Sequence, residues 1–155
     1  MSREPELVDV LTPQRVLILE STAKADVLRT MADCLATAPE IQDSDALIRG
    51  IFHREELMST GIGMGVGVPH VRLESVTGPV MSAAVCRNPV VDYESLDGEP
   101  VRLVFMIAAG RYQHAEYIRL LSSLSLRFKC EKLRNSLIAA PDPLAFYRTL
   151  VEQEK

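Results

Sequence analysis

Apolar residues recur along the chain in two patterns, one typical of amphipathic helices and one typical of buried strands. The run RVLILE, residues 15–20, is short, apolar and followed by polar residues, which predicts a strand. Two helices are predicted next, one capped by Ser21 or Thr22 and running to about Ala38, the other starting in residues 43–47 and running to about Met58.

The second half of the chain continues this alternation of strands and helices. Residues 79–86 and 101–109 are nearly continuous in apolar character, which predicts strands covered on both faces, with turn signals at Asn88-Pro89 and Asp97-Gly98 between them. Helical spacing returns after Tyr112, and two short closing helices are predicted at residues 131–140 and 144–153. No repeat or linker divides the 155 residues, so we expect a single α/β domain over residues 1–155.

Composition and charge exclude several classes of partner. The net charge of −4 and pI near 5.4 do not favour nucleic-acid or anionic-membrane binding. The longest apolar run, residues 103–109, is too short to span a bilayer, and the first residues lack the apolar core of a signal peptide. Three widely spaced cysteines (Cys34, Cys86 and Cys130) fit a reducing compartment, so a cytoplasmic protein is predicted.

The most informative stretch is STGIGMGVGVPHVRL, residues 59–73, with four glycines in seven positions before Pro69-His70. A helix rather than a strand precedes it, so it is not a dinucleotide fingerprint, and no Gly-Lys-Ser/Thr ends it as in a phosphate-binding P-loop. The three histidines at 53, 70 and 114 with Glu55 lack the spacing of a metal-binding helix face. We therefore expect no cofactor and no metal.

The residues around these glycines have the parts for phosphoryl chemistry. Pro69 fixes its own φ and biases Val68 towards an extended backbone, so residues 66–69 are predicted to form a short strand that ends at His70. Arg54 lies sixteen residues earlier, at the end of the second helix. Neutral imidazole is a competent nucleophile, guanidinium neutralises phosphate oxygens, and backbone amides of the glycine-rich stretch supply further donors.

A family resemblance rests on these residues. The segment REELMSTGIGMGVGVPH, residues 54–70, closely resembles the signature of the fructose/mannitol-type enzyme IIA domains of the bacterial phosphotransferase system, a group that includes the nitrogen-regulatory IIA proteins. The segment VDYESLDGEPVRLVFMIAA, residues 91–109, extends the match. The resemblance implies a mixed central sheet flanked by helices, with His70 accepting a phosphoryl group and Arg54 stabilising it.

The resemblance also implies partners. The phosphoryl donor would be the phosphocarrier protein HPr or its nitrogen-branch paralogue. The acceptor would be a sugar-transporter IIB domain, or the phosphorylation state would regulate a target protein. A regulatory protein is favoured over a sugar-specific fructose- or mannitol-type component, and a diverged binding module that has lost phosphotransfer is the third alternative.

Three positions depart from the family pattern. Gly67 replaces a usual alanine, Val71 replaces a small residue and is expected to crowd the site, and Tyr117 stands where the pattern has a second histidine. His114, three residues earlier, either serves by a shifted geometry or caps the helix or faces solvent. Ser59 and Thr60 are candidate phosphate ligands that can equally bond the local backbone, and Glu55 is a candidate support for Arg54 or the loop.

Overall fold

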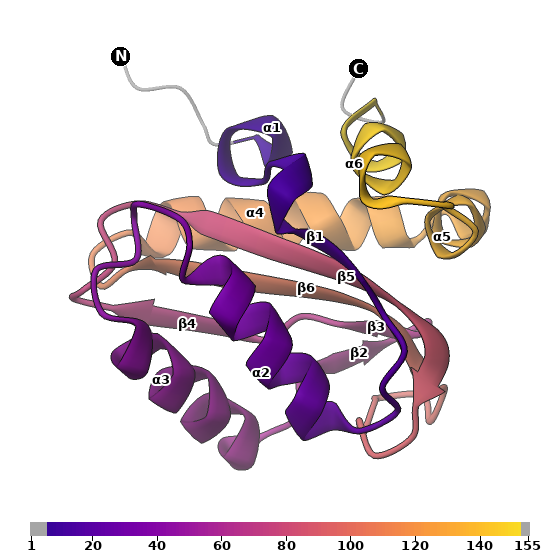
Figure 1. The fold of residues 1–155 in the computed structure, drawn as a ribbon, viewed down its shortest axis with the longest axis horizontal. Helices are drawn as coiled ribbons and strands as arrows, with labels where there is room; N and C mark the ends of the chain where they lie inside the picture. The colour runs from indigo at the N-terminus through magenta and orange to yellow at the C-terminus, as the bar shows by residue number, and fades with distance from the viewer. Residues whose placement is uncertain (1–5, 153–155) are drawn as a thin grey trace.

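The computed structural model describes residues 6–152 as one sheet with helices on both faces (Figure 1). The strands are β1 (Val16–Leu19), β2 (Gly61–Gly63), β3 (Val66–Gly67), β4 (His70–Leu73), β5 (Val80–Val90) and β6 (Val101–Gly110). The helices are α1 (Leu7–Val10), η1 (Pro13–Arg15, a 3-10 turn), α2 (Lys24–Leu35), α3 (Ser44–Leu57), α4 (His114–Phe128), α5 (Glu131–Ile138) and α6 (Pro143–Glu152).

The sheet is mixed, as the family resemblance implies. Its order is β1-β5-β6-β3-β2, and β4 also pairs with β6, beyond the end of β3. Strand β6 is antiparallel to β5 but parallel to β3 and β4, with Gly67 opposite Val104 and His70 opposite Ile107. Pro69 separates the two short strands, and its carbonyl accepts a hydrogen bond from Ile107 N (3.0 Å). The edge of β6 thus fixes the place where His70 begins a strand.

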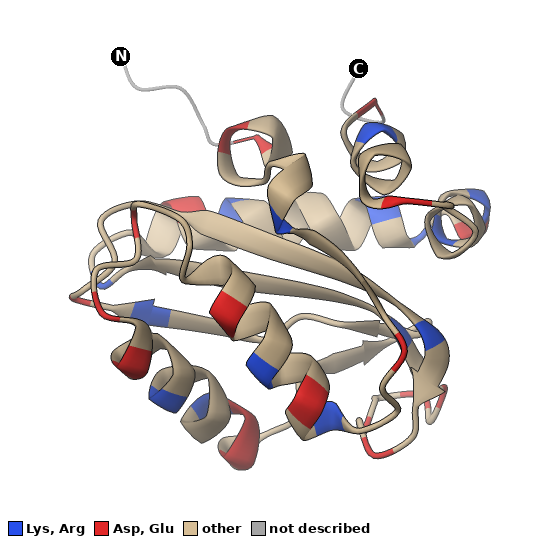
Figure 2. Cartoon of the chain, viewed as in Figure 1, with Lys and Arg blue, Asp and Glu red and all other residues tan. Residues whose placement is uncertain are grey.

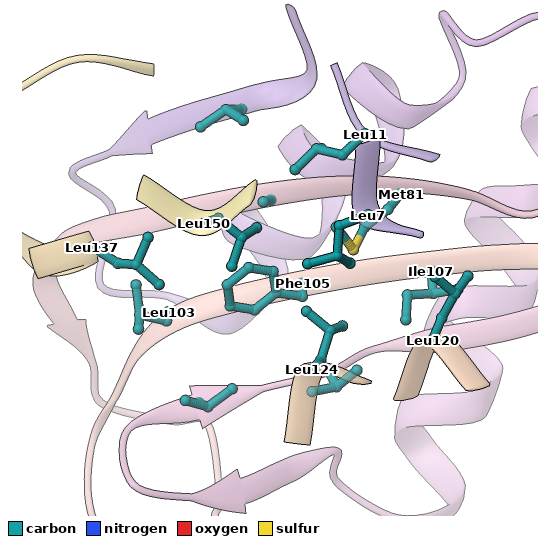
Figure 3. Packing of buried hydrophobic residues seen from close by; sticks show 14 of the residues in the cluster. Leu7, Leu11, Met81, Leu103, Phe105, Ile107, Leu120, Leu124, Leu137 and Leu150 are labelled. Carbon is teal, nitrogen blue, oxygen red and sulfur yellow. The ribbon is translucent and has the colours of Figure 1, made fainter. Parts of the chain in front are cut away.

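Helices α1, α4, α5 and α6 cover one face of the sheet and bury the larger apolar cluster around Phe105 (Figure 3). The ring of Phe105 lies 4.7 Å from that of Phe128 and 6.0 Å from that of Phe146, centroid to centroid. Tyr117 belongs to this cluster. The site residue contributed by α4 is therefore anchored in the core.

Helices α2 and α3 cover the other face, where a second cluster is buried. Its members include Leu28 and Met31 of α2 together with Leu47 and Ile51 of α3. Figure 2 shows acidic and basic residues interspersed over the helices and loops, while most of the length of β5 and β6 is uncharged. Two buried faces explain the nearly continuous apolar runs of these strands.

Three predicted details are wrong. Helix α2 has no side-chain cap from Ser21 or Thr22; its N-cap is Ala23, and the amide of Lys24 instead donates to Asp92 Oδ1 (2.7 Å) from the loop after β5. The Asn88-Pro89 pair makes no turn, because β5 continues to Val90 across an irregular register. His70 begins β4 rather than ending the strand before it.

Candidate active site

His70 is held in one orientation by the backbone of its own strand. Its Nδ1 lies 2.6 Å from the carbonyl oxygen of Val68. Because a carbonyl only accepts hydrogen bonds, this contact assigns the ring proton to Nδ1. The lone pair of the neutral ring is therefore on Nε2.

Burial keeps the His70 ring neutral. Desolvation is the main cause that lowers its pKa below the usual 6.5, and the positive charge of Arg54 lowers it further. The hydrogen bond to Val68 and the negative charge of Glu55 act in the opposite direction without reversing the shift. At pH 7 the side chain is the uncharged nucleophile that phosphoryl transfer requires.

A pocket of about 490 Å³ lies beside His70 at the sheet edge, between α3 and α4. Its lining comes from α3, β4 and α4 (Gly50, His53, Arg54, Leu57, His70, Val71, Arg72, Leu73 and Tyr117). Arg54 is half-buried in the last turn of α3, where its Nη1 donates to the carbonyl of Met58 (2.9 Å). The structure thus brings His70 and Arg54 to one pocket, as the sequence predicts.

Tyr117, not His114, lies against His70. Tyr117 is 7% exposed, and its ring centroid is 5.2 Å from that of His70. His114 is the exposed first residue of α4, with its ring 6.5 Å from that of Tyr117 and outside the pocket lining. The tyrosine therefore stands between the two histidines.

The glycine-rich stretch forms a hairpin, β2–β3, whose turn lies away from His70. Gly63 and Gly65 have φ of +97° and +76°, a region open to glycine. The carbonyl of Gly65 accepts from the amides of Arg102 and Leu103, whereas His70 pairs with Ile107. At about 3.3 Å per residue, the turn is roughly 15 Å from the histidine along the sheet. The prediction that backbone amides of this glycine-rich turn act as donors at the site is therefore wrong.

A buried polar cluster links the hairpin to α3. The hydroxyl of Thr60 donates to a Glu55 carboxylate oxygen and bonds the hydroxyl of Tyr93 (2.7 Å). Lys24 Nζ pairs with the other Glu55 oxygen (3.0 Å) and lies 4.4 Å from the centroid of the Tyr93 ring. Burial, with the adjacent Glu55 charge, raises the pKa of Tyr93 well above its usual range. These groups are outside the pocket lining.

This cluster reaches His70 through the backbone. The carbonyl of Thr60 accepts from the amide of Val68 (3.0 Å), and the carbonyl of Val68 accepts from His70 Nδ1. Ser59 lies at the cluster's edge, where its Oγ donates to the carbonyl of Glu94 (2.6 Å). Glu55, Thr60 and Ser59 are thus engaged in bonds that fix the hairpin.

Gly67 and Val71 depart from the family pattern, and the size of each side chain is complementary to that of a neighbouring residue. A β-carbon on Gly67 would lie 2.6 Å from Cζ of Tyr93, so the glycine makes room for the buried ring. Alternation along β4 turns Val71 to the face opposite His70, where a β-carbon on Gly50 would lie 3.0 Å from its Cγ2. Val71 therefore occupies space left by Gly50 of α3, and it also lines the His70 pocket.

Among the charged residues of the pocket lining, sequence reasoning missed Arg72. It lies two residues after His70 in β4 and lines the same pocket. Strand alternation starting from His70 would have placed both side chains on one face, but β4 itself was not predicted.

Comparisons with known proteins agree with this architecture. The family model described as "Phosphoenolpyruvate-dependent sugar phosphotransferase system, EIIA 2" matches residues 9–153. The chain is 34% identical over 151 residues to the fructose-specific EIIABC component of Bacillus subtilis (strain 168), covering 97% of this chain and 24% of that protein. It is 31% identical over 147 residues to a nitrogen regulatory protein of Pseudomonas aeruginosa, covering 94% of this chain and 95% of that one.

A solved structure shows the same fold. The nitrogen regulatory protein IIA-Ntr of Neisseria meningitidis superposes with a TM-score of 0.85 at 25% identity, over 94% of this chain and 99% of that one. The chain belongs to the type 2 EIIA family of the phosphoenolpyruvate-dependent sugar phosphotransferase system. It is thus a phosphotransferase component. None of the helices between residues 6 and 152 has the length and apolar character to cross a membrane.

Proposed function

We propose that His70 carries the phosphoryl group and accepts it on Nε2. The observation that supports this most is the 2.6 Å contact of Nδ1 with Val68 O, which leaves Nε2 as the nucleophilic nitrogen of a neutral ring lining the pocket. In the transfer, Nε2 forms a bond to phosphorus as the nitrogen–phosphorus bond of a donor phosphohistidine breaks. The donor ring, which carries a proton on its other nitrogen, keeps the electron pair of the broken bond and leaves as neutral imidazole.

The Val68 carbonyl has a second role after the transfer. The phosphorylated His70 ring keeps its proton on Nδ1, where Val68 O continues to accept it. On onward transfer the ring departs as neutral imidazole, a good leaving group, without a separate protonation step. One hydrogen bond thus suits His70 to both halves of the carrier cycle.

Arg54 stabilises the phosphoryl oxygens, because a guanidinium donates charge-assisted hydrogen bonds. Tyr117 supports the His70 ring. Its hydroxyl takes the hydrogen-bonding role that the second histidine has in the family pattern. Glu55 and Thr60 position His70 through the Val68 backbone, and Ser59 fixes the hairpin. His114 takes part in the transfer only in the complex with a partner, where its exposed ring turns inward.

The donor is HPr or its nitrogen-branch paralogue, and the recipient is a IIB domain or a regulated target protein. A regulatory role is favoured by the similarity to two nitrogen regulatory proteins along nearly their whole length. A sugar-specific role in fructose uptake is the second candidate, favoured by the 34% identity to a fructose-specific component.

The test is transfer of labelled phosphate from phosphoenolpyruvate through enzyme I and each HPr paralogue. We expect an acid-labile, base-stable label on the wild type and none on His70→Ala. His53→Ala, which removes a histidine from the same pocket lining, is the matched control and should label normally. A wild type that stays unlabelled with both paralogues would leave only the diverged binding module. Onward transfer to a IIB domain separates the sugar role from the regulatory one.

A further inference from the structure

We propose that Arg72 is a second phosphate-binding arginine of the His70 pocket, contacting the phosphoryl group from β4 while Arg54 contacts it from α3. This inference rests on the proposed function of His70 as the phosphoryl carrier. It assigns a direct role in transfer to a residue beyond the family signature of residues 54–70.

The strand places Arg72 beside the nucleophile. His70 and Arg72 are two residues apart in β4, paired opposite Ile107 and Ala109 of β6. Side chains at this spacing point to the same face, with their Cα atoms about 6.6 Å apart. An extended arginine side chain spans that distance, so its guanidinium reaches a group bound to the His70 ring.

Tyr117 orients the guanidinium. Cζ of Arg72 lies 5.9 Å from the centroid of the Tyr117 ring, within the range of a cation–π contact. The same ring lies 5.2 Å from that of His70, and it is held in the core of the α4 face. The buried tyrosine is therefore a fixed platform between the nucleophile and the arginine.

The positive charge of Arg72 is available for a ligand. Arg29 and Arg111 pair with the carboxylates of Asp33 and Glu74, whereas within residues 6–152 no carboxylate pairs with Arg72 or Arg54. Two such guanidinium groups from different elements line one pocket with a neutral histidine. A phosphoryl dianion on Nε2 complements this arrangement, and planar guanidinium groups bind phosphate oxygens in pairs.

The experiment compares Arg72→Gln, Arg72→Lys and a matched control, Arg49→Gln, which removes the same charge from an exposed position of α3 outside the pocket lining. Each protein is phosphorylated by HPr and, separately, by phosphoramidate. In the second reaction the reagent's nitrogen–phosphorus bond breaks, ammonia leaves with the electron pair, and Nε2 forms the new bond. The readouts are the rate, the equilibrium constant for transfer from HPr, and the Arg72 Nε–H signal by NMR.

We expect Arg72→Gln to lower the rate with both donors and to shift the transfer equilibrium about tenfold towards HPr. Arg72→Lys should recover most of that shift, since it keeps the charge but not the paired geometry. Arg49→Gln should match the wild type. In the wild type, the Arg72 Nε–H signal should move on phosphorylation. All variants should keep the wild-type Tm.

Three results would overturn the proposal. Wild-type equilibrium and rates in Arg72→Gln would show that the arginine does not touch the phosphoryl group. A defect with HPr and none with phosphoramidate would make Arg72 a docking residue instead. A wild type that neither donor phosphorylates would overturn the proposed function itself, an outcome distinct from the first two.

Discussion

At the residue scale, the reactivity of His70 depends on its surroundings more than on its type. The Val68 carbonyl sets the tautomer, burial keeps the ring neutral, and the core residue Tyr117 limits where the ring can go. The sequence alone predicted the histidine and the arginine but left open which nitrogen reacts. That choice depends on a backbone contact two residues away, which no side-chain pattern encodes.

The lowered pKa of His70 gives a pH prediction. Because the folded protein binds this proton less readily than the unfolded chain, whose histidine pKa is near 6.5, the free energy of unfolding should fall as pH drops through 6.5. NMR titration should place the His70 midpoint below 6.5. Wild type should lose stability relative to His70→Gln between about pH 7.5 and 5 in denaturant titrations.

Arg54→Gln provides the control for this titration. Removing the neighbouring positive charge should raise the His70 midpoint without reversing the effect of burial, which is the larger cause. A wild-type midpoint at or above 6.5 would contradict the assignment of a neutral, desolvated nucleophile.

At the element scale, the glycine hairpin is an anchor for the strand before His70. Its polar cluster joins α2, α3 and the loop after β5 through Lys24, Glu55, Thr60 and Tyr93. Such contacts between residues 38 positions apart, as for Tyr93 and Glu55, leave no periodic signal in a sequence. The helix α3, by contrast, was predictable because its Asp43 cap and its Leu47/Ile51 spacing are local.

Gly67→Ala tests the fit between hairpin and cluster. The added methyl group would meet the Tyr93 ring, so we expect a loss of about 1–3 kcal/mol in unfolding free energy. Gly78→Ala is the control, since its β-carbon would meet only Glu40 Cγ at an ordinary 3.5 Å, and it should change stability by less than about 0.5 kcal/mol.

The double variant Gly67→Ala/Tyr93→Leu identifies the cause of that loss. If the ring is what the methyl group strikes, the glycine substitution should cost less in the Tyr93→Leu background. Additive costs in this double-mutant cycle, measured by denaturant unfolding, would show that the glycine serves the backbone instead.

At the scale of the whole molecule, the alternation of helices and apolar strands predicted the α/β layers, and the resemblance implied the mixed sheet. Strand β4 was missed because it is an edge strand whose residues His70 and Arg72 are polar, so its apolar pattern is weak. Its position is fixed by pairing with β6, more than thirty residues later. The pocket exists because the pairing of β4 with β6 brings α3 and α4 together at one edge of the sheet.

The location of the pocket predicts the face that a phosphoryl donor contacts. Leu57 of α3 lines the pocket and is 68% exposed, and Leu126 of α4 is 67% exposed. Leu126 follows Tyr117 by nine residues, which turns it to the opposite side of the helix. We expect Leu57→Asp to slow phosphoryl transfer from HPr about tenfold, mainly through KM, and Leu126→Asp to leave it unchanged. Equal effects of the two variants would place the contact elsewhere.

The most direct test of the proposed carrier chemistry is the identity of the phosphorylated atom. Long-range ¹H–¹⁵N NMR of the protein phosphorylated by HPr distinguishes the two ring nitrogens of each histidine. We expect phosphate on Nε2 of His70, with the proton retained on Nδ1 by the Val68 carbonyl. Phosphate on Nδ1 of His70, or on His53 or His114, would contradict the proposed mechanism.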